Sequence, residues 1–420
     1  MILKGLNKYE IYDSESFKGR DKSVELSLDI LKKTKILVIN GIEGSGKSSF
    51  IESGILKRIV SGFPAKSGRD WSICNFRPGI SPINNLCRAL SNSDSFYLNS
   101  KPKSSDFNEY KKIINQKGAN GIIEIYKKSE IFDKKNLLIV IDQAEDLYNY
   151  SKVFDHEVST EDNLLIDLIY SSVKNDYCSI YFIISIQNNS LSKLNLYGKF
   201  SELLSLGQYN LPNLNIKEFY SLIRNDLNFE ISDDIIPKIQ QQVAENPFYL
   251  TNFQYLLNKY NEHDFSANNL LDSKTYTDNG KIDKIICKDL DNYYDKLNKK
   301  NKIQFSLLLR ALINSDYSLM ENYYQKFEFI RNYLDISAKE LTNFILKINN
   351  DFGRIFDIIE KDISGIKPIN NFIINDQDII TIKYPKSLSW DFLKKIEKEE
   401  NNIYTFFEKF HTTINDGKEL

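Results

Sequence analysis

The chain has 420 residues, more than one hydrophobic core usually serves, so we expect two or three domains. Hydrophobic residues make up 41 % and aromatic residues 13 %, which excludes a disordered protein, and a formal net charge of −2 gives no general attraction to nucleic acid or anionic lipid. The four cysteines have no C-x-x-C spacing and there are three histidines, so neither a zinc site nor a disulfide framework is expected.

The first residues, MILKGLNKYE, lack the apolar core of a signal peptide. No apolar run reaches the roughly 18 residues of a membrane span, and we expect a cytoplasmic protein with reduced thiols. Apolar residues at helical spacing from Val24 to Leu31 predict a helix that ends at Lys32 and Lys33. Arg20, just ahead of that helix, is either a nucleotide contact or an ordinary surface arginine.

Residues 36–50, ILVINGIEGSGKSSF, carry the strongest signal in the chain. Four apolar β-formers lead into a glycine-rich loop of the form G-x-x-x-x-G-K-[ST], and a helix begins near Lys47. Glycines let the backbone N–H groups face a phosphate, and the helix start adds its positive dipole end. We expect Lys47 to reach the β- and γ-phosphates and Ser48 to ligate Mg²⁺. The candidate nucleotide-binding residues of the loop are Gly41, Glu43, Gly44, Ser45, Gly46, Lys47, Ser48 and Ser49.

A second strand, 71–77, is followed by Arg77-Pro78-Gly79 and a helix from Pro82. Residues 137–142, LLIVID, then predict a strand that is buried on both faces. Asp142 stands at its end, where a carboxylate can hold Mg²⁺ through water. Glu145 and Asp146 follow, so further acids lie within reach of the same site.

Residues 179–187, SIYFIISIQ, predict a third buried strand whose end lies beside Asp142. Gln187 stands where many P-loop ATPases place a polar group that senses the γ-phosphate, although strand ends rich in Asn are often only turns. Strands that alternate with helices indicate a parallel sheet flanked by helices, and all these motifs fall at its carboxyl edge. The predicted fold class is therefore α/β, with a P-loop NTPase sheet.

After about residue 205, helices replace strands and predict a small lid that includes 216–227, 233–243 and 248–260. Pro247 either packs against adenine or only opens the last of these helices. Residues 261–283 are expected to be a polar linker. Three further helices and a hairpin at 372–384 suggest a winged-helix domain, whose mixed-sign lysines indicate a solvated face. The expected domains are a nucleotide-binding domain (1–205), a helical lid (206–275) and a winged helix (276–420).

The motifs together resemble the bacterial STAND ATPases of the novel STAND group. The similarity includes Phe17-Lys18-Gly19-Arg20, the loop with its continuation GKSSFIESGIL, the RPG segment at 77–79, and LLIVIDQAEDLY. The resemblance implies an ATP/ADP switch in which ATP or ADP, with Mg²⁺, controls oligomerisation and an effector, often in defence against phage. It assigns nucleotide and metal to Lys47, Ser48 and Asp142, and the orientation of the attacking water to Glu145 or Asp146.

Two positions depart from the family pattern. An arginine is usual where Gln187 stands, and a winged-helix histidine has Lys383 or Tyr384 in its place. Loss of a planar, bidentate donor predicts slow or absent hydrolysis, while Lys383 can still meet a phosphate as a point charge. Because the sequence ends soon after the winged-helix segment, we expect effector and sensor to be separate proteins in a hetero-oligomer. The alternatives are a DNA-acting ATPase of the AAA-like type and a scaffold with a nucleotide that is never hydrolysed.

Overall fold

The computed structural model describes residues 3–5, 7–92, 96–98, 101, 103, 105–149, 160–194, 197–262, 269–312, 324–352, 355–359 and 379–382. The chain divides into two compact units. One contains Met1–Leu270, and the other contains Leu271–Ile358 and the strand Ile379–Ile382. The predicted boundary between residues 205 and 206 falls inside a helix, Phe200–Gly207. The three-domain division stays a prediction.

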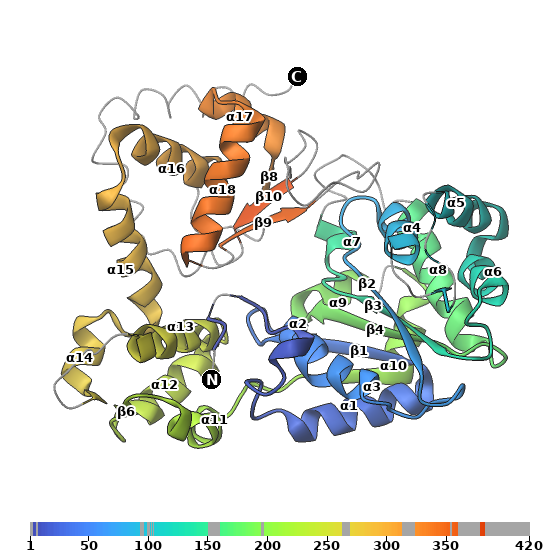
Figure 1. The fold of residues 1–420 in the computed structure, drawn as a ribbon, viewed down its shortest axis with the longest axis horizontal. Coiled ribbons are helices and arrows are strands. Elements are labelled where there is room, and N and C mark those ends of the chain that lie inside the picture. The colour runs from blue at the N-terminus through green and yellow to red at the C-terminus, as the bar shows by residue number, and fades with distance from the viewer. Residues whose placement is uncertain are drawn as a thin grey trace. The chain divides into compact units, whose positions relative to one another are not determined.

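A five-stranded parallel sheet forms the centre of the first unit (Figure 1). Its order is β2-β3-β4-β1-β5, with β1 (Ile36–Gly41), β2 (Trp71–Phe76), β3 (Asn136–Ile141), β4 (Ile180–Gln187) and β5 (Gln208–Asn210). The strands β1, β3 and β4 are buried along almost their whole length, as parallel strands covered on both faces require. The predicted α/β fold with a P-loop NTPase sheet is confirmed.

Successive residues of the central strands face two separate hydrophobic clusters. In β1, Ile36 and Val38 join the cluster that includes residues of α4 (Pro82–Asn92), α5 (Asp106–Lys117), α6 (Gly121–Lys128), α8 (Thr160–Lys174) and α10 (Phe200–Gly207). Leu37 and Ile39 join the other, with α1 (Asp21–Thr34) and the helix after the loop. That helix consists of α2 (Lys47–Ser49), a π-helical segment Phe50–Leu56 and α3 (Lys57–Val60). Helices therefore cover both faces, and the carboxyl ends of the strands form the edge at which such sheets bind ligands.

The strand β5 corrects the expectation that strands end before residue 205. Its three residues, QYN, pair with Val38–Asn40 of β1 and extend the sheet by one strand. A polar run of this length shows no periodicity, so only its pairing with the edge of β1 makes it a strand. The expected helices follow as α11 (Ile216–Ile223), α12 (Ile235–Glu245) and α13 (Tyr249–Glu262), beside the short strands β6 (Glu230–Ile231) and β7 (Leu270–Leu271).

The second unit combines helices with a three-stranded sheet of order β8-β10-β9. Its elements are α14 (Ser273–Asp278), α15 (Lys281–Lys296), α16 (Lys299–Leu312), β8 (Tyr324–Lys326), α17 (Phe327–Leu334), α18 (Ala338–Phe352), β9 (Phe356–Ile359) and β10 (Ile379–Ile382). The expected linker at 261–283 is wrong in part, because the side chain of Asp272 accepts a hydrogen bond from Thr275 N and caps α14 inside it. Within the expected hairpin, β10 pairs antiparallel with β8; the rest of that hairpin lies outside the described residues. The winged-helix assignment stays a prediction.

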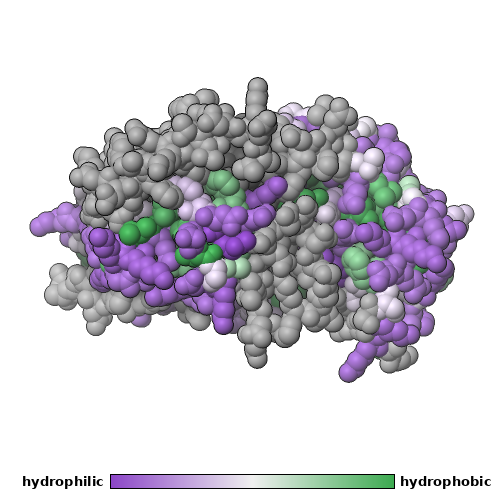
Figure 2. Space-filling view, turned by 90° about the horizontal axis from the view of Figure 1, so that it is seen from above, coloured by the Kyte–Doolittle hydropathy of each residue, from purple (hydrophilic) through white to green (hydrophobic). Residues whose placement is uncertain are grey.

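Figure 2 shows one face of the molecule, on which hydrophilic residues cover most of the described surface. The exposed large hydrophobic side chains come from separate segments: Tyr12, Leu26, Ile42, Val60, Tyr177, Leu222 and Leu270. Exposed apolar side chains that are scattered singly are ordinary on protein surfaces. Across the described ranges, no helix combines the length and the apolar character that crossing a membrane requires.

Candidate functional site

The glycine-rich loop has the backbone that its sequence predicts. Gly44 (φ +79°) and Gly46 (φ +85°) adopt left-handed conformations that other residues rarely take, and α2 begins directly after them at Lys47. A Cβ built on Gly46 meets nothing within 4 Å, so the loop borders open space there. The hydroxyl of Ser45 is buried and has no hydrogen-bond partner in the described part of the chain. The loop thus combines left-handed glycines, open space at Gly46 and an unused hydroxyl, which are features that suit an anion site.

Lys47 lies inside the loop with only 9 % of its surface exposed. Its Nζ donates to Gly41 O at 3.0 Å and to Ile42 O at 3.1 Å. Burial lowers the pKa of Lys47, and the negative charges of Glu145, Asp142 and Glu43 oppose that shift. The ammonium therefore rests on neutral carbonyls, which an anionic oxygen can replace at little cost.

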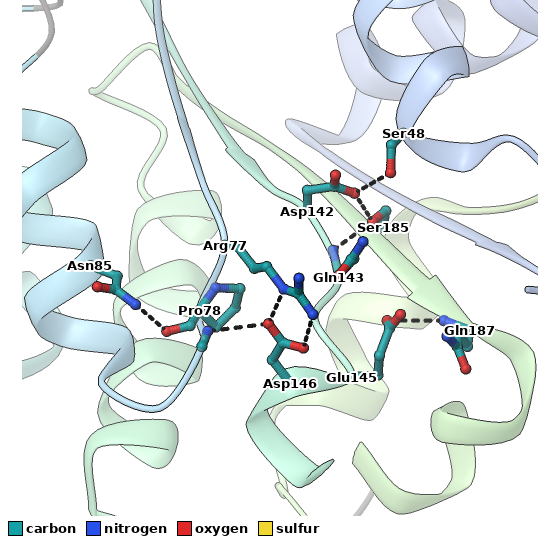
Figure 3. Close-up of polar contacts among 11 residues, drawn as sticks. Ser48, Arg77, Pro78, Asn85, Asp142, Gln143, Glu145, Asp146, Ser185 and Gln187 are labelled. Atoms are coloured by element: carbon teal, nitrogen blue, oxygen red, sulfur yellow. Dashed lines mark hydrogen bonds and ion pairs between the residues drawn. The ribbon is translucent and has the colours of Figure 1, made fainter. Parts of the chain in front are cut away.

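Ser48 and Asp142, which are distant in sequence, meet at this loop (Figure 3). The Ser48 hydroxyl donates to Asp142 Oδ1 at 3.0 Å. Asp142 follows β3 directly, and the neighbouring strand β4 supplies a second hydroxyl, Ser185, which donates to the same Oδ1 at 2.5 Å. A hydroxyl and a carboxylate beside a phosphate cradle are the protein groups that Mg²⁺ uses in P-loop proteins. Ser185 could not be predicted as part of this site, because a serine inside an apolar strand has no local signal in the sequence.

Glu145 is a buried acid next to this pair, with 4 % of its surface exposed. Its Oε2 accepts a hydrogen bond from the backbone N–H of Gln187 at 3.2 Å. Burial raises the pKa of Glu145 to about 7, although the charge of Lys47 acts in the opposite direction. Gln187 is the last residue of β4 and is in register with Gly41, so the predicted sensor position does lie beside the loop. It is the backbone of Gln187 that contacts Glu145.

Asp146 has different surroundings from Asp142 and Glu145. Its side chain is 1 % exposed and forms an ion pair with Arg77, in which Nη2 donates to Oδ1 at 2.9 Å and Nε donates to Oδ2. The N–H of Gly79 also donates to Oδ2, at 3.3 Å. The carboxylate thus joins α7 (Asp146–Asn149) to the turn after β2. This arrangement favours Glu145 over Asp146 for orienting a water molecule.

Arg20 is buried, with 6 % of its surface exposed, and both arms of its guanidinium hold backbone carbonyls. Nη2 donates to Ser45 O in the loop at 3.2 Å, and Nη1 donates to Pro212 O in the segment between β5 and α11. Burial lowers the pKa of Arg20 to about 10. Arg20 therefore joins the phosphate loop to the chain that enters the helices α11–α13.

The start of α13 also lies against the loop. A Cβ on Gly44 would lie 2.8 Å from Phe248 Cα and 2.9 Å from Phe248 N, so these two backbones touch. Pro247 is buried beside this contact, directly ahead of α13. At the start of the loop helix, Ser49 Oγ accepts from Tyr9 N at 3.1 Å. Lys383 lies outside the described residues.

Comparison with known proteins gives a family and distant structural neighbours. The family model described as Novel STAND NTPase 1 matches residues 3–330. The Walker-type ATPase paby2304 of Pyrococcus abyssi is 14 % identical, with a TM-score of 0.44, and the alignment covers 94 % of this chain and 100 % of that one. The ORC2 protein of Aeropyrum pernix, in ADPNP-ADP complexes, is 12 % identical with a TM-score of 0.42, over 94 % of this chain and 96 % of that one. A search of the curated proteins found no match.

Proposed function

The chain belongs to the novel STAND NTPase 1 family, and we propose that it is an ATP-binding switch whose ATP or ADP state controls a partner effector, with slow or absent hydrolysis. One observation carries the proposal: the loop that would hold the phosphates touches the helices that follow the sheet. Gly44 meets Phe248, and Arg20 holds Ser45 O and Pro212 O together. A ligand that changes the loop must therefore act on both contacts.

The loop residues have distinct tasks in this proposal. A bound nucleotide with Mg²⁺ would supply the phosphates and the divalent charge. The backbone N–H groups of Gly44 and of residues 46–49 would donate to phosphate oxygens, and Lys47 would exchange its two carbonyl acceptors for a phosphate. Ser48 and Asp142 would hold the metal ion, Ser48 directly and Asp142 through water. Pro247, buried next to the loop, would lie on the side where lid and nucleotide meet.

Slow hydrolysis follows from the charges at the strand ends. Rapid phosphoryl transfer uses a planar cation where charge develops, and Gln187 supplies none at the end of β4. Arg20 and Arg77 already hold carbonyls and a carboxylate, respectively. Glu145, as the candidate acid for orienting water, is buried and has a raised pKa, which lowers its negative charge near neutral pH.

Nucleotide retention by the purified protein tests the proposal. We expect ATP or ADP to be released on denaturation, and Lys47→Ala to weaken ATP binding at least hundredfold, because a buried charged contact is worth about 3 kcal/mol. Lys57→Ala, an exposed lysine in α3, is the matched control and should bind as the parent does. Equal binding by Lys47→Ala would overturn the proposal. Turnover should be slower than about 0.1 s⁻¹, below the usual enzyme range of about 1–10³ s⁻¹.

The switch itself has a separate measurement. Hydrogen exchange in residues 246–262 and 211–216 should differ between the ATP and ADP states, since Phe248 touches the loop directly and Pro212 is joined to it through Arg20. Identical exchange in both states, with nucleotide bound, would favour a scaffold with a permanently bound nucleotide.

The proposed partner is a separate effector or sensor protein in the cytoplasm, in antiphage defence or signalling. Products of neighbouring genes should co-elute with the chain in one nucleotide state more than in the other. A DNA-acting ATPase would instead show salt-dependent binding of duplex DNA. A chain that binds nucleotide yet co-elutes with none of these products in either state would contradict control of a partner.

A further inference from the structure

We propose that Ser185 is a positioning residue that fixes the Asp142 carboxylate for the Mg²⁺ ion that accompanies the nucleotide. The inference rests on the proposed nucleotide-binding function and deepens it. Ser185 lies in β4, the strand between β3 and β1, and its side chain is fully buried. Its hydroxyl donates to Asp142 Oδ1 at 2.5 Å and accepts from the backbone N–H of Gln143 at 2.8 Å (Figure 3).

The backbone after β3 explains why Asp142 needs such a contact. Asp142 is the first residue beyond the strand, and Gln143 takes a left-handed conformation with φ +60°. A residue other than glycine keeps a left-handed conformation only where the surrounding structure imposes it. Here Ala144 N donates to Ser185 O at 2.9 Å, while the Ser185 hydroxyl takes the Gln143 N–H. One residue of β4 therefore sets both the turn and the side chain of Asp142.

Ser48 and Ser185 both donate to Asp142 Oδ1, but they differ in their expected role when a metal ion binds. Both hydroxyls donate to Asp142 Oδ1, and Oδ2 has no hydrogen-bond partner within the described ranges. Ser48 belongs to the loop helix, and its hydroxyl is expected to ligate the metal ion. Ser185 lies in a central strand of the sheet, and its side chain is fully buried. It can hold Asp142 in one orientation while Ser48 changes partner, and the carboxylate would then remain placed to help hold Mg²⁺.

One other buried serine, Ser172, shows the alternative, purely structural use of a hydroxyl. Ser172, fully buried in α8, donates to Leu168 O at 2.7 Å within its own helix. Such bonds satisfy a polar group locally and serve no distant residue. Ser185 differs because its acceptor is a charged side chain at the candidate metal site. Loss of a group that orients a metal ligand typically weakens metal binding by about 10- to 100-fold.

Mg²⁺ titration of nucleotide binding tests the inference. ATP affinity is measured by fluorescence of an ATP analogue, first in EDTA and then with increasing Mg²⁺. For Ser185→Ala, the Mg²⁺ concentration at half-maximal effect should rise at least about tenfold, with affinity in EDTA unchanged. Ser185→Thr keeps a hydroxyl and should restore the parent value. Ser172→Ala, the matched buried control, should leave it unchanged.

The outcomes separate the inference from the function on which it rests. If the parent protein binds no nucleotide, the proposed function fails. If the parent binds and Ser185→Ala needs no more Mg²⁺ than the parent, the positioning role is overturned. Should the alanine variant fail to fold, Ser185→Cys keeps the size of the side chain with a weak donor and should show the same raised Mg²⁺ requirement. A parent-like requirement in a folded Ser185→Cys would equally overturn the role.

Discussion

Asp142 and Asp146 follow the same strand, yet their surroundings differ in kind. Asp142 is half-buried and receives two neutral hydroxyls on one oxygen. Asp146 is buried and receives the guanidinium of Arg77 together with a backbone N–H. The Asp142 carboxylate can still bind a cation, whereas the Asp146 carboxylate is already paired with Arg77. Residue type alone therefore does not distinguish a candidate metal ligand from a structural acid. The groups that each carboxylate contacts make the distinction.

The two cations of this region repeat the difference. Lys47 rests on the carbonyls of Gly41 and Ile42, and exchange for phosphate oxygens would strengthen its bonds. Arg77 holds a buried carboxylate, and moving it would leave that charge unpaired. We infer that the groups around Lys47 can exchange partners for a ligand, whereas the ion pair of Arg77 with Asp146 stabilises the fold. The following predictions test this contrast, from the largest expected effect to the smallest.

Arg77→Ala should destabilise the first unit by about 3–5 kcal/mol, because it leaves the buried Asp146 carboxylate without its cation. Urea unfolding would report a lower midpoint. The double variant Arg77→Leu with Asp146→Asn removes both charges and should recover much of the loss. A cost below about 1 kcal/mol for Arg77→Ala would mean that the ion pair of Arg77 with Asp146 does not stabilise the fold as inferred.

Glu145→Gln should change how stability depends on pH in the absence of nucleotide. The native pKa of Glu145, about 7, lies above the ordinary value of 4.5, so the folded protein holds a proton that the unfolded chain releases. The contribution of Glu145 to stability therefore falls as pH rises from about 4.5 to 7 and is then constant. The variant lacks this loss and should gain on the order of 3 kcal/mol relative to the parent between pH 4.5 and 8. Parallel pH profiles of denaturant unfolding would contradict the raised pKa.

Gly44→Ala should cost about 2 kcal/mol of stability, because it adds a left-handed alanine and forces the backbone at Phe248 to move. Gly68→Ala is the matched control: its φ is +90°, but its Cβ would meet nothing within 4 Å. The excess of the first cost over the second measures the contact between the loop and the start of α13. Equal shifts in unfolding temperature for both variants would show that the contact of Gly44 with Phe248 adds no stability and plays no part in the proposed switch.

Arg58→Ala should change stability by no more than about 0.5 kcal/mol. Its ion pair with Asp21 spans 3.4 Å, and the two side chains are 56 % and 75 % exposed, so water and salt screen it. Thermal unfolding at two salt concentrations would measure this. A loss as large as that of Arg77→Ala would show that burial does not distinguish the ion pairs.

Much of the fold could be predicted because its signals are local. Runs such as LLIVI and IYFII specify buried parallel strands, and the glycine pattern at 41–48 specifies the loop. The strand β5 and the helix α14 were missed, since a polar triplet and a capped turn have no periodicity of their own. The pairing of Arg77 with Asp146 was missed for a related reason: it joins residues that only the sheet brings together.

The amino-acid sequence by itself determined the phosphate loop, the acid that follows β3 and the class of fold, because each depends on residues that are adjacent in the chain. Only the tertiary structure decided that Asp142 is held by Ser185, that Asp146 belongs to Arg77, and that Arg20 bonds carbonyls of the loop and of the segment entering α11. These roles depend on which strand ends are neighbours in the order β2-β3-β4-β1-β5, and that order is set by the packing of the whole sheet.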